Sequence, residues 1–233
     1  MLVYLPPGYQ NSHARYPVLY MQDGQNLFDA ATAFAGNEWR TDMIADECIR
    51  SGRVEPLIIV GIYNTGVRRI SEYTPTRDRR LRKGGKAERY AQMLAREIKP
   101  FIDHEYRARK SAGDTGVGGS SLGALVSLAA GLRYPQVFGK LALMSPSVWW
   151  DEHSILSLIA GWKGERRPRV WLDTGTEEGN NPQKVVADAR LMRDALAQKG
   201  CELHYEEAQG HQHNEAAWSA RFGRVLEYLF PRK

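Results

Sequence analysis

The chain has 233 residues, which is enough for one α/β domain with a sizeable buried core. Hydrophobic residues make up 42% of it and charged residues 25%, as is ordinary for a globular protein. No apolar run approaches the roughly 20 residues that are needed to cross a bilayer. We therefore predict a single domain over residues 1–233 that does not insert into a membrane.

The net charge is +5, and arginines gather in residues 77–83 and 166–169. Such basic stretches can indicate a nucleic-acid partner. Here no aromatic side chains alternate with the arginines, and acidic residues are nearly as numerous as basic ones over the whole chain. We therefore expect both stretches to be solvated surface, and we predict no nucleic-acid partner.

The cysteines and the first residues bear on where the protein works. Cys48 and Cys201 lie far apart and lack the spacing of metal ligands, although the sequence alone leaves a disulfide between them open. Residues 1–7 lack the basic start and the long apolar core of a signal peptide. These features predict a cytoplasmic protein, or a chain from which an upstream segment is missing.

Segments typical of strands and segments typical of helices alternate along the chain. Short β-rich or apolar runs bounded by Pro, Gly or Asn predict strands, and apolar residues at helical spacing predict helices. The predicted strands are residues 2–5, 16–21, 57–62, 114–117, 138–144, 169–173 and 202–207. The predicted helices are residues 38–49, 86–102, 125–132, 182–198 and 216–230. Between them, residues 64–85 are the longest stretch without a predicted element, and loops of this length usually carry a function or lack order.

This alternation predicts a doubly wound, mainly parallel sheet with helices on both faces. The continuous apolar run at residues 57–62 supports it, because such a run suits a strand that is covered on both sides. In sheets of this kind, ligands bind beyond the carboxyl ends of the strands. The candidate site residues all follow predicted strands: Gln25, Ser121, Trp149, Glu178 and His213.

One short motif has the context of a catalytic serine. Gly119 and Gly123 flank Ser121, with the predicted strand 114–117 before them and an apolar run of helix length after them. A strand, a glycine-flanked serine and a helix form the nucleophile elbow of serine hydrolases. The turn is so tight that side chains two residues away from the serine would collide, which explains the glycines. A glycine-rich turn that binds nothing is the alternative, because this motif also occurs by chance.

A serine hydroxyl needs a base to attack a carbonyl at neutral pH, usually a histidine that a carboxylate orients. Four histidines follow Ser121 in the chain. His204 lies inside a predicted strand, and His153 precedes the expected acid. His211 and His213 lie in the loop after the last strand, where the base belongs. The alternatives for this pair are two exposed loop histidines or a metal site, which would need a third ligand.

Five segments of the chain, in order, resemble the esterase D-like family of α/β-hydrolases. That family includes siderophore esterases, feruloyl esterases, S-formylglutathione hydrolases and mycolyltransferases. The resemblance covers nearly the whole chain, and five motifs in the right order are more specific than one elbow. The segments are residues 20–28, 69–75, 118–123, 145–150 and 213–218.

The resemblance implies an α/β-hydrolase fold with a mainly parallel sheet of about seven to eight strands, and a serine esterase that needs no metal or cofactor. Ser121 resembles the nucleophile. In the family the base is followed five residues later by a tryptophan, and His213 has Trp218 at this spacing whereas His211 has none. The family's acid lies in a G-x-x-[DE] turn after a strand, which selects Glu178, although Asp173 and Glu177 lie close by.

The resemblance also implies an oxyanion hole made by the backbone N–H groups of Gln25 and Leu122. Leu122 would lie at a helix N-terminus, where the helix dipole favours negative charge. Around this centre, Trp149, Trp150 and Arg69 are expected to line a pocket that suits an aromatic or anionic substrate. Either tryptophan could equally be a core residue.

The expected substrate is a small-molecule ester with a short or aromatic group. An acyltransferase, in which an alcohol or a sugar replaces water, is an alternative within the same fold. A domain that binds a ligand or a partner without catalysis is an alternative of another class. Two departures from the family pattern are Ala124, where a second glycine is common, and a start at what resembles the second strand of the fold. One edge strand could therefore be absent.

Overall fold

Seven strands form one central sheet in residues 1–232, the part of the chain that the computed structural model describes. Their order across the sheet is β1-β3-β2-β6-β7-β8-β9. β1 pairs antiparallel with β3, and every other neighbouring pair in this sheet is parallel. The mainly parallel sheet is therefore confirmed. The strands are β1 (Leu2–Tyr4), β2 (Val18–Gln22), β3 (Ile58–Ile62), β6 (Thr115–Ser120), β7 (Lys140–Met144), β8 (Arg169–Gly175) and β9 (Glu202–Ala208).

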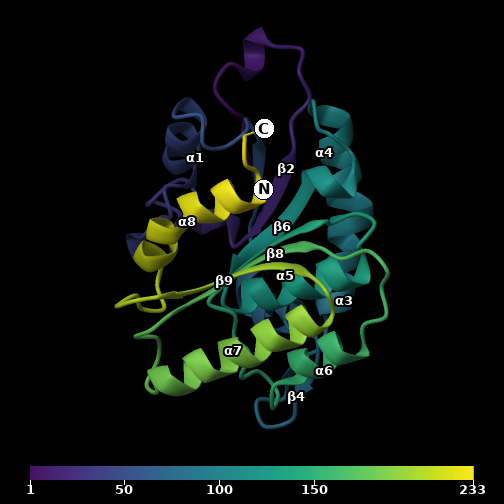
Figure 1. The fold of residues 1–233 in the computed structure, drawn as a ribbon, viewed down its shortest axis with the longest axis vertical. Coiled ribbons are helices and arrows are strands. Elements are labelled where there is room, and N and C mark those ends of the chain that lie inside the picture. The colour runs from purple at the N-terminus through teal and green to yellow at the C-terminus, as the bar shows by residue number, and fades with distance from the viewer. Residues whose placement is uncertain (233) are drawn as a thin grey trace.

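Helices cover both faces of this sheet (Figure 1). One face packs against α1 (Thr41–Arg50) and α8 (Glu215–Leu229), whose buried side chains share a cluster. The other face packs against a larger group of helices. That group is α3 (Ala87–Met93), α4 (Lys99–Glu105), α5 (Leu122–Arg133), α6 (Ser154–Gly161) and α7 (Pro182–Gln198).

The central strands have no polar face, because each of their two sides meets a layer of helices. In β3, Ile58 and Val60 belong to the core under α5, whereas Ile59 belongs to the core under α8. Successive side chains of a strand point to opposite faces, so both sets must be apolar. The prediction that residues 57–62 form a strand covered on both sides is therefore confirmed.

The predicted helix over residues 86–102 is interrupted. α3 passes into a π-helical turn at Leu94–Ile98, and α4 then continues to Glu105. Pro100, which has no backbone N–H, lies in the first turn of α4, directly after the wide turn. Hydrogen bonding is therefore rearranged within a helix that otherwise follows the predicted pattern.

The sequence predicted no helix or strand in residues 64–85, but the structure has both there. This stretch contains the short helix α2 (Arg69–Tyr73) and a small hairpin of β4 (Arg77–Asp78) and β5 (Lys83–Gly84). Tyr73 is fully buried and stacks edge-on against Tyr90 of α3, with ring centroids 5.2 Å apart. Tertiary packing thus holds a helix that is too short to be stable by itself.

Two further expectations concern the whole chain. Within residues 1–232, no helix is both long enough and apolar enough to cross a membrane. Cys48 and Cys201 are free thiols, so the disulfide that the sequence left open is not formed.

Candidate active site

Ser121 lies at a sharp turn between the end of β6 and the start of α5. Its backbone has φ 58° and ψ −123°, a conformation that costs energy for any residue other than glycine. The flanking glycines are required by β2. A Cβ on Gly119 would lie 3.0 Å, and one on Gly123 3.1 Å, from Cβ of Gln22. The predicted sharp turn at Ser121 is therefore confirmed. A side chain at either flanking position would come too close to β2, which explains the two glycines.

Ser121 and His213 line the same cavity, which has a volume of about 370 Å³. Gln25 and Arg69 line it as well. The hydroxyl of Ser121 also lies 3.0 Å from the hydroxyl of Ser147, which the sequence had not singled out. The structure thus brings together four of the predicted site residues: Gln25, Ser121 and His213 follow β2, β6 and β9, and Arg69 lies in the short helix after β3.

His213 is held by a buried carboxylate. Its Nδ1 lies 2.7 Å from Oε2 of Glu178, a side chain that is only 1% exposed. The ring also meets the indole of Trp218 edge-on, with ring centroids 5.0 Å apart. Asn214, the next residue, caps α8 by accepting a hydrogen bond of 2.9 Å from the backbone N–H of Ala217. The start of the helix therefore fixes the histidine just before it.

Glu178 is ionised in this environment. Burial by itself would raise its pKa, but hydrogen bonds from His213 and Ser145, the charge of His213 and the N–H of Gly175 outweigh it and leave the pKa below its ordinary value. An ionised carboxylate only accepts hydrogen bonds, so Nδ1 of His213 carries the proton. In the neutral form of the imidazole, Nε2 then has a lone pair that can accept a proton.

The other two acids that the sequence offered have different surroundings. Glu177 is exposed. Asp173 is fully buried and accepts hydrogen bonds from Nε1 of Trp171, at 2.7 Å, and from Nη2 of Arg221, at 3.1 Å. Among these three acids, only Glu178 has a hydrogen bond to His213.

The loop after β2 carries the other predicted backbone donor, Gln25. Asp23 takes a left-handed conformation, with φ 55°, and its carboxylate accepts two hydrogen bonds of 2.7 Å from Arg69. Asn64 donates a further one of 2.7 Å to the same side chain. The N–H groups of Gln25 and Leu122 both lie in the first turn of a helix, where they have no acceptor within that helix. Gln25 is among the residues that line the cavity, and Leu122 directly follows Ser121.

The two tryptophans do not line this cavity. Trp150 is 1% exposed and donates to the carbonyl of Thr76 at 3.1 Å, so it is a core residue and its prediction as a pocket wall is wrong. Trp149 is 51% exposed and borders another depression, together with Arg80 and His153. Adjacent residues in this turn point in different directions, which the sequence could not resolve.

The other three histidines that follow Ser121 in the chain have other partners. His204 lies in β9, as its predicted strand implies, and stacks on Trp171, with ring centroids 4.4 Å apart. His153 contacts Asp188 through Nε2 at 2.9 Å. His211 contacts Nη1 of Arg221 through Nδ1 at 3.1 Å. Within residues 1–232, no three His, Cys, Asp or Glu side chains are grouped so that they could hold a metal ion.

Arg221 is the functional candidate that sequence reasoning missed. It is fully buried in α8, a helix whose other buried side chains form an apolar stripe that includes Trp218, Phe222 and Val225. A charged residue inside such a stripe was the available signal, because a buried charge needs a partner.

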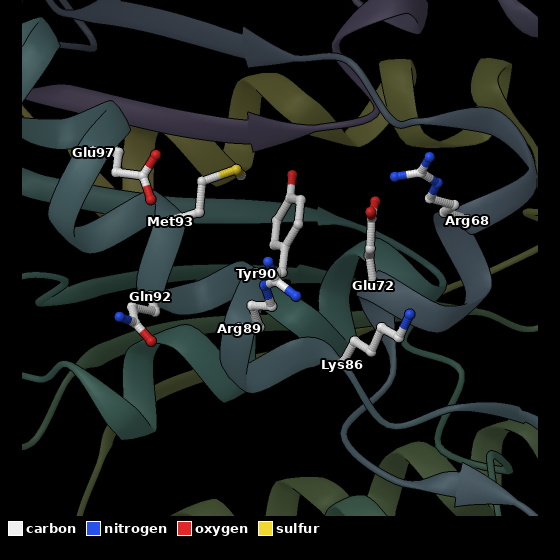
Figure 2. Close-up of a pocket in the computed structure, with 8 residues that line it drawn as sticks. All are labelled: Arg68, Glu72, Lys86, Arg89, Tyr90, Gln92, Met93 and Glu97. Atoms are coloured by element: carbon white, nitrogen blue, oxygen red, sulfur yellow. The ribbon is translucent and has the colours of Figure 1, made fainter.

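A larger cavity of about 550 Å³ lies beside α2 and α3 (Figure 2). Figure 2 shows Tyr90 at its centre, between Glu72 and Arg68 on one side and Met93 and Glu97 on the other. The hydroxyl of Tyr90 donates to Oε1 of Gln22. None of the predicted site residues lines this cavity.

The sheet, the strained serine and the helices on both faces define an α/β-hydrolase. The chain matches the family described as "Putative esterase" over residues 1–229, and it belongs to that family. It is thus an esterase-family hydrolase, as the motifs predicted.

Several relatives align with nearly the whole chain. The uncharacterized protein YbbA of Bacillus subtilis is 27% identical over 240 residues, covering 98% of this chain and 91% of YbbA. The uncharacterized protein YjcH of the same organism is 30% identical over 236 residues, covering 98% and 90%. An endo-1,4-beta-xylanase/feruloyl esterase of Xylanibacter ruminicola is 25% identical over 234 residues, covering 98% of this chain but 29% of that protein.

Solved structures share the fold. The BES protein from Bacillus cereus superposes with a TM-score of 0.75 at 24% identity, covering 98% of this chain and 87% of that one. The enterobactin esterase FES from Shigella flexneri, in the presence of enterobactin, gives a TM-score of 0.79 at 18% identity, covering 97% and 54%.

Proposed function

We propose that the protein is a serine carboxylesterase that hydrolyses short-chain or aromatic esters through an acyl-enzyme on Ser121. One observation carries the proposal. Ser121 and His213 line one cavity, and the Nδ1 of that histidine is hydrogen-bonded to the buried carboxylate of Glu178. A nucleophile, a base and an acid in this relation are what acyl transfer to water requires.

In the proposed reaction, Nε2 of His213 takes the proton of the Ser121 hydroxyl while Oγ attacks the ester carbonyl carbon. The carbonyl oxygen becomes an oxyanion, which accepts hydrogen bonds from the N–H groups of Gln25 and Leu122. The bond to the alcohol oxygen then breaks, and His213 gives its proton to the departing alcohol. An acyl-enzyme remains.

The second half of the reaction repeats these steps with water. His213 takes a proton from the water as the water oxygen attacks the acyl carbon. The bond to Oγ of Ser121 breaks, the serine regains its proton from His213, and the carboxylic acid leaves. Glu178 stays ionised and stabilises the imidazolium that forms in each half.

Arg69 supports the proposal in a way that differs from its predicted role. Both of its hydrogen bonds to Asp23 are already made, and its guanidinium lies over the ring of Tyr73, 5.0 Å from the centroid. Its charge is therefore neutralised locally, which argues against an anionic substrate. We propose that Arg69 holds the turn that presents the N–H of Gln25.

The size of the cavity supports a small ester. Each buried methylene contributes about 0.8 kcal/mol, and only where an apolar wall exists to bury it. Most of the residues around Ser121 are polar, among them Asn26, Asn64 and Glu215, and the apolar part of the wall comes with Phe34 and Trp218. We propose a preference for acyl chains of about two to six carbons, or for an aromatic group such as those named by the feruloyl and enterobactin esterases.

Labelling and turnover test the proposal together. A fluorophosphonate should label the wild-type protein with one equivalent at Ser121, and it should leave Ser121→Ala unlabelled. Ser121→Ala should also lose ester hydrolysis by a factor on the order of a million, because triad residues act as a unit. Activity of this variant above a hundredth of wild type in a clean preparation would overturn the assignment.

A panel of p-nitrophenyl esters of graded chain length, with methyl ferulate added, defines the substrate class. A preference for chains of twelve or more carbons, measured as kcat/KM, would contradict the proposed small cavity. Transacylated product at high alcohol concentration would favour an acyltransferase. A protein that neither labels nor turns over any ester would be a binding domain.

A further inference from the structure

A chain of buried hydrogen bonds lies behind Glu178, on the side away from His213. Its members come from three elements that are distant in sequence, namely β8, α8 and the turn after β7. Asp173 lies at one end and Glu178 at the other, and both are nearly inaccessible to solvent. Arg221 and Ser145 connect them, with exposed fractions of 0% and 2%.

The direction of every hydrogen bond in this chain is fixed by the chemistry of its members. Nη2 of Arg221 donates to Asp173 at 3.1 Å and to Oγ of Ser145 at 2.9 Å, and Nε1 of Trp218 donates to the same Oγ at 3.0 Å. Guanidinium and indole N–H groups cannot accept a hydrogen bond. The hydroxyl proton of Ser145 must therefore point to its remaining partner, Oε1 of Glu178.

The two carboxylate oxygens of Glu178 thus have different partners. Oε1 accepts from Ser145 and, at 2.6 Å, from the N–H of Gly175. Nη2 of Arg221 lies 3.9 Å from the same oxygen. Oε2 is left to accept from Nδ1 of His213. The carboxylate cannot rotate toward any other partner without breaking a bond to a buried charge, which is costly.

The backbone of Ser145 gives an independent sign that its hydroxyl is needed. Ser145 has φ 43°, a left-handed conformation that glycine adopts more readily than any other residue. A strained non-glycine residue persists where its surroundings or its role require it. Here the side chain supplies one of the two hydrogen-bond donors to Oε1 of Glu178, and the other is the backbone N–H of Gly175.

We propose that Ser145 is a positioning residue for Glu178, and that Arg221, anchored by Asp173, sets the direction of the Ser145 hydroxyl. This inference rests on the proposed function, because the group that it positions is the proposed triad acid. Its effect reaches the reaction only through Glu178 and His213. Asp173, which the sequence offered as a rival acid, is in this scheme the counter-ion of Arg221.

The test removes the hydroxyl without adding strain. Ser145→Gly suits the left-handed backbone, and Ser145→Ala removes the same hydroxyl but keeps the strain. We expect both variants to lower kcat by about 10- to 100-fold, the effect of one lost hydrogen bond to a buried charge. KM should stay within about twofold of wild type, because the substrate does not touch Ser145. Arg221→Lys keeps the charge but cannot reach all the partners of Arg221, and it should fall in the same range.

Two comparisons separate positioning from a merely structural role. Arg224→Lys, an exposed arginine of the same helix that pairs with Glu206, is the matched control and should leave kcat unchanged. In addition, proton NMR of protein labelled with ¹⁵N-histidine follows the Nδ1 proton of His213 directly, assigned by its loss in His213→Gln. The proton that His213 shares with Glu178 should resonate far downfield in wild type and should broaden or vanish in Ser145→Gly. The ring proton that His153 shares with Asp188 should persist as an internal reference.

The NMR signal does not depend on turnover, so failures of the two proposals can be told apart. A wild-type protein without esterase activity that shows this signal, and loses it in Ser145→Gly, would overturn the proposed function and uphold the positioning role. Both Ser145 variants with kcat within threefold of wild type and an unchanged signal would overturn the positioning role, even if Arg221→Lys does not fold.

Discussion

His213 and His211 are two residues apart, yet their rings have different partners. His213 faces the cavity of Ser121 and contacts Glu178, whereas His211 contacts the buried guanidinium of Arg221. A general base must reach the proton that it removes, so only one of the two can serve. This difference allows a direct comparison of two single variants.

We expect His213→Ala to lose as much activity as Ser121→Ala, because the members of such a triad act together. His211→Ala should cost less than about tenfold, since it removes one of several partners of Arg221. Turnover of one ester under identical conditions measures both variants. If His211→Ala were the inactive one, the base would have been assigned two residues too far along the chain.

Glu177 and Glu178 are adjacent in the chain, but their surroundings differ. Glu178 is buried against His213, and Glu177 is exposed. Glu178→Gln should lower kcat by about two to four orders of magnitude, because the amide cannot hold the Nδ1 tautomer or stabilise an imidazolium. Glu177→Gln keeps the same turn and should cost little. Near-wild-type activity in both variants would leave a serine–histidine dyad.

At the scale of elements, the start of α8 is what fixes the position of His213. Asn214 caps this helix, just as Asn181 caps α7 by accepting from the N–H of Lys184. Replacing such a cap by alanine costs about 0.5–2 kcal/mol of folding free energy. The two caps are chemically alike, but only Asn214 adjoins a proposed catalytic residue.

Asn214→Ala and Asn181→Ala should therefore lower the free energy of unfolding by similar amounts, and only Asn214→Ala should also lower kcat, by about three- to thirtyfold. Urea unfolding measures the first quantity, and turnover of one ester measures the second. Equal kcat in the two variants would show that the helix start does not aim the histidine.

At the scale of the whole molecule, alternating strands and helices were enough to predict the sheet, because burial on both faces leaves a clear apolar pattern in residues such as those of β3. The glycine-flanked serine motif selected Ser121, and the resemblance to the esterase family selected Glu178 and His213. Ser121 and His213 line one cavity, and Glu178 contacts His213. Side-chain direction in irregular turns was not predictable, so Trp150 was misplaced. The hydrogen bonds of Arg221 to Asp173 and Ser145 were not predictable either. These residues are distant in sequence, and no local pattern connects them.

The hydrogen-bond donors around Glu178 make the free energy of unfolding depend on pH. The pKa of this carboxyl lies below its ordinary value of 4.5 in the folded protein, so the unfolded chain takes up its proton at a higher pH than the folded one. The stabilisation from the ionised form is therefore fully present above about pH 4.5 and is lost as the pH falls through the folded pKa. Arg221 and His213 on the α8 side, and Asp173 on β8, are the charged or titratable groups that surround it.

We expect the unfolding free energies of wild type and Glu178→Gln to converge as the pH falls from about 5 to 3, because protonated Glu178 no longer gains from its donors. Urea unfolding at each pH measures this difference, with Glu177→Gln as the control for losing an acid from the same turn. A difference that stayed constant or widened over this window would mean that the donors around Glu178 do not favour its charged form. The positioning role of Ser145 would then lose its physical basis, since a neutral Glu178 would no longer need that hydroxyl as a donor.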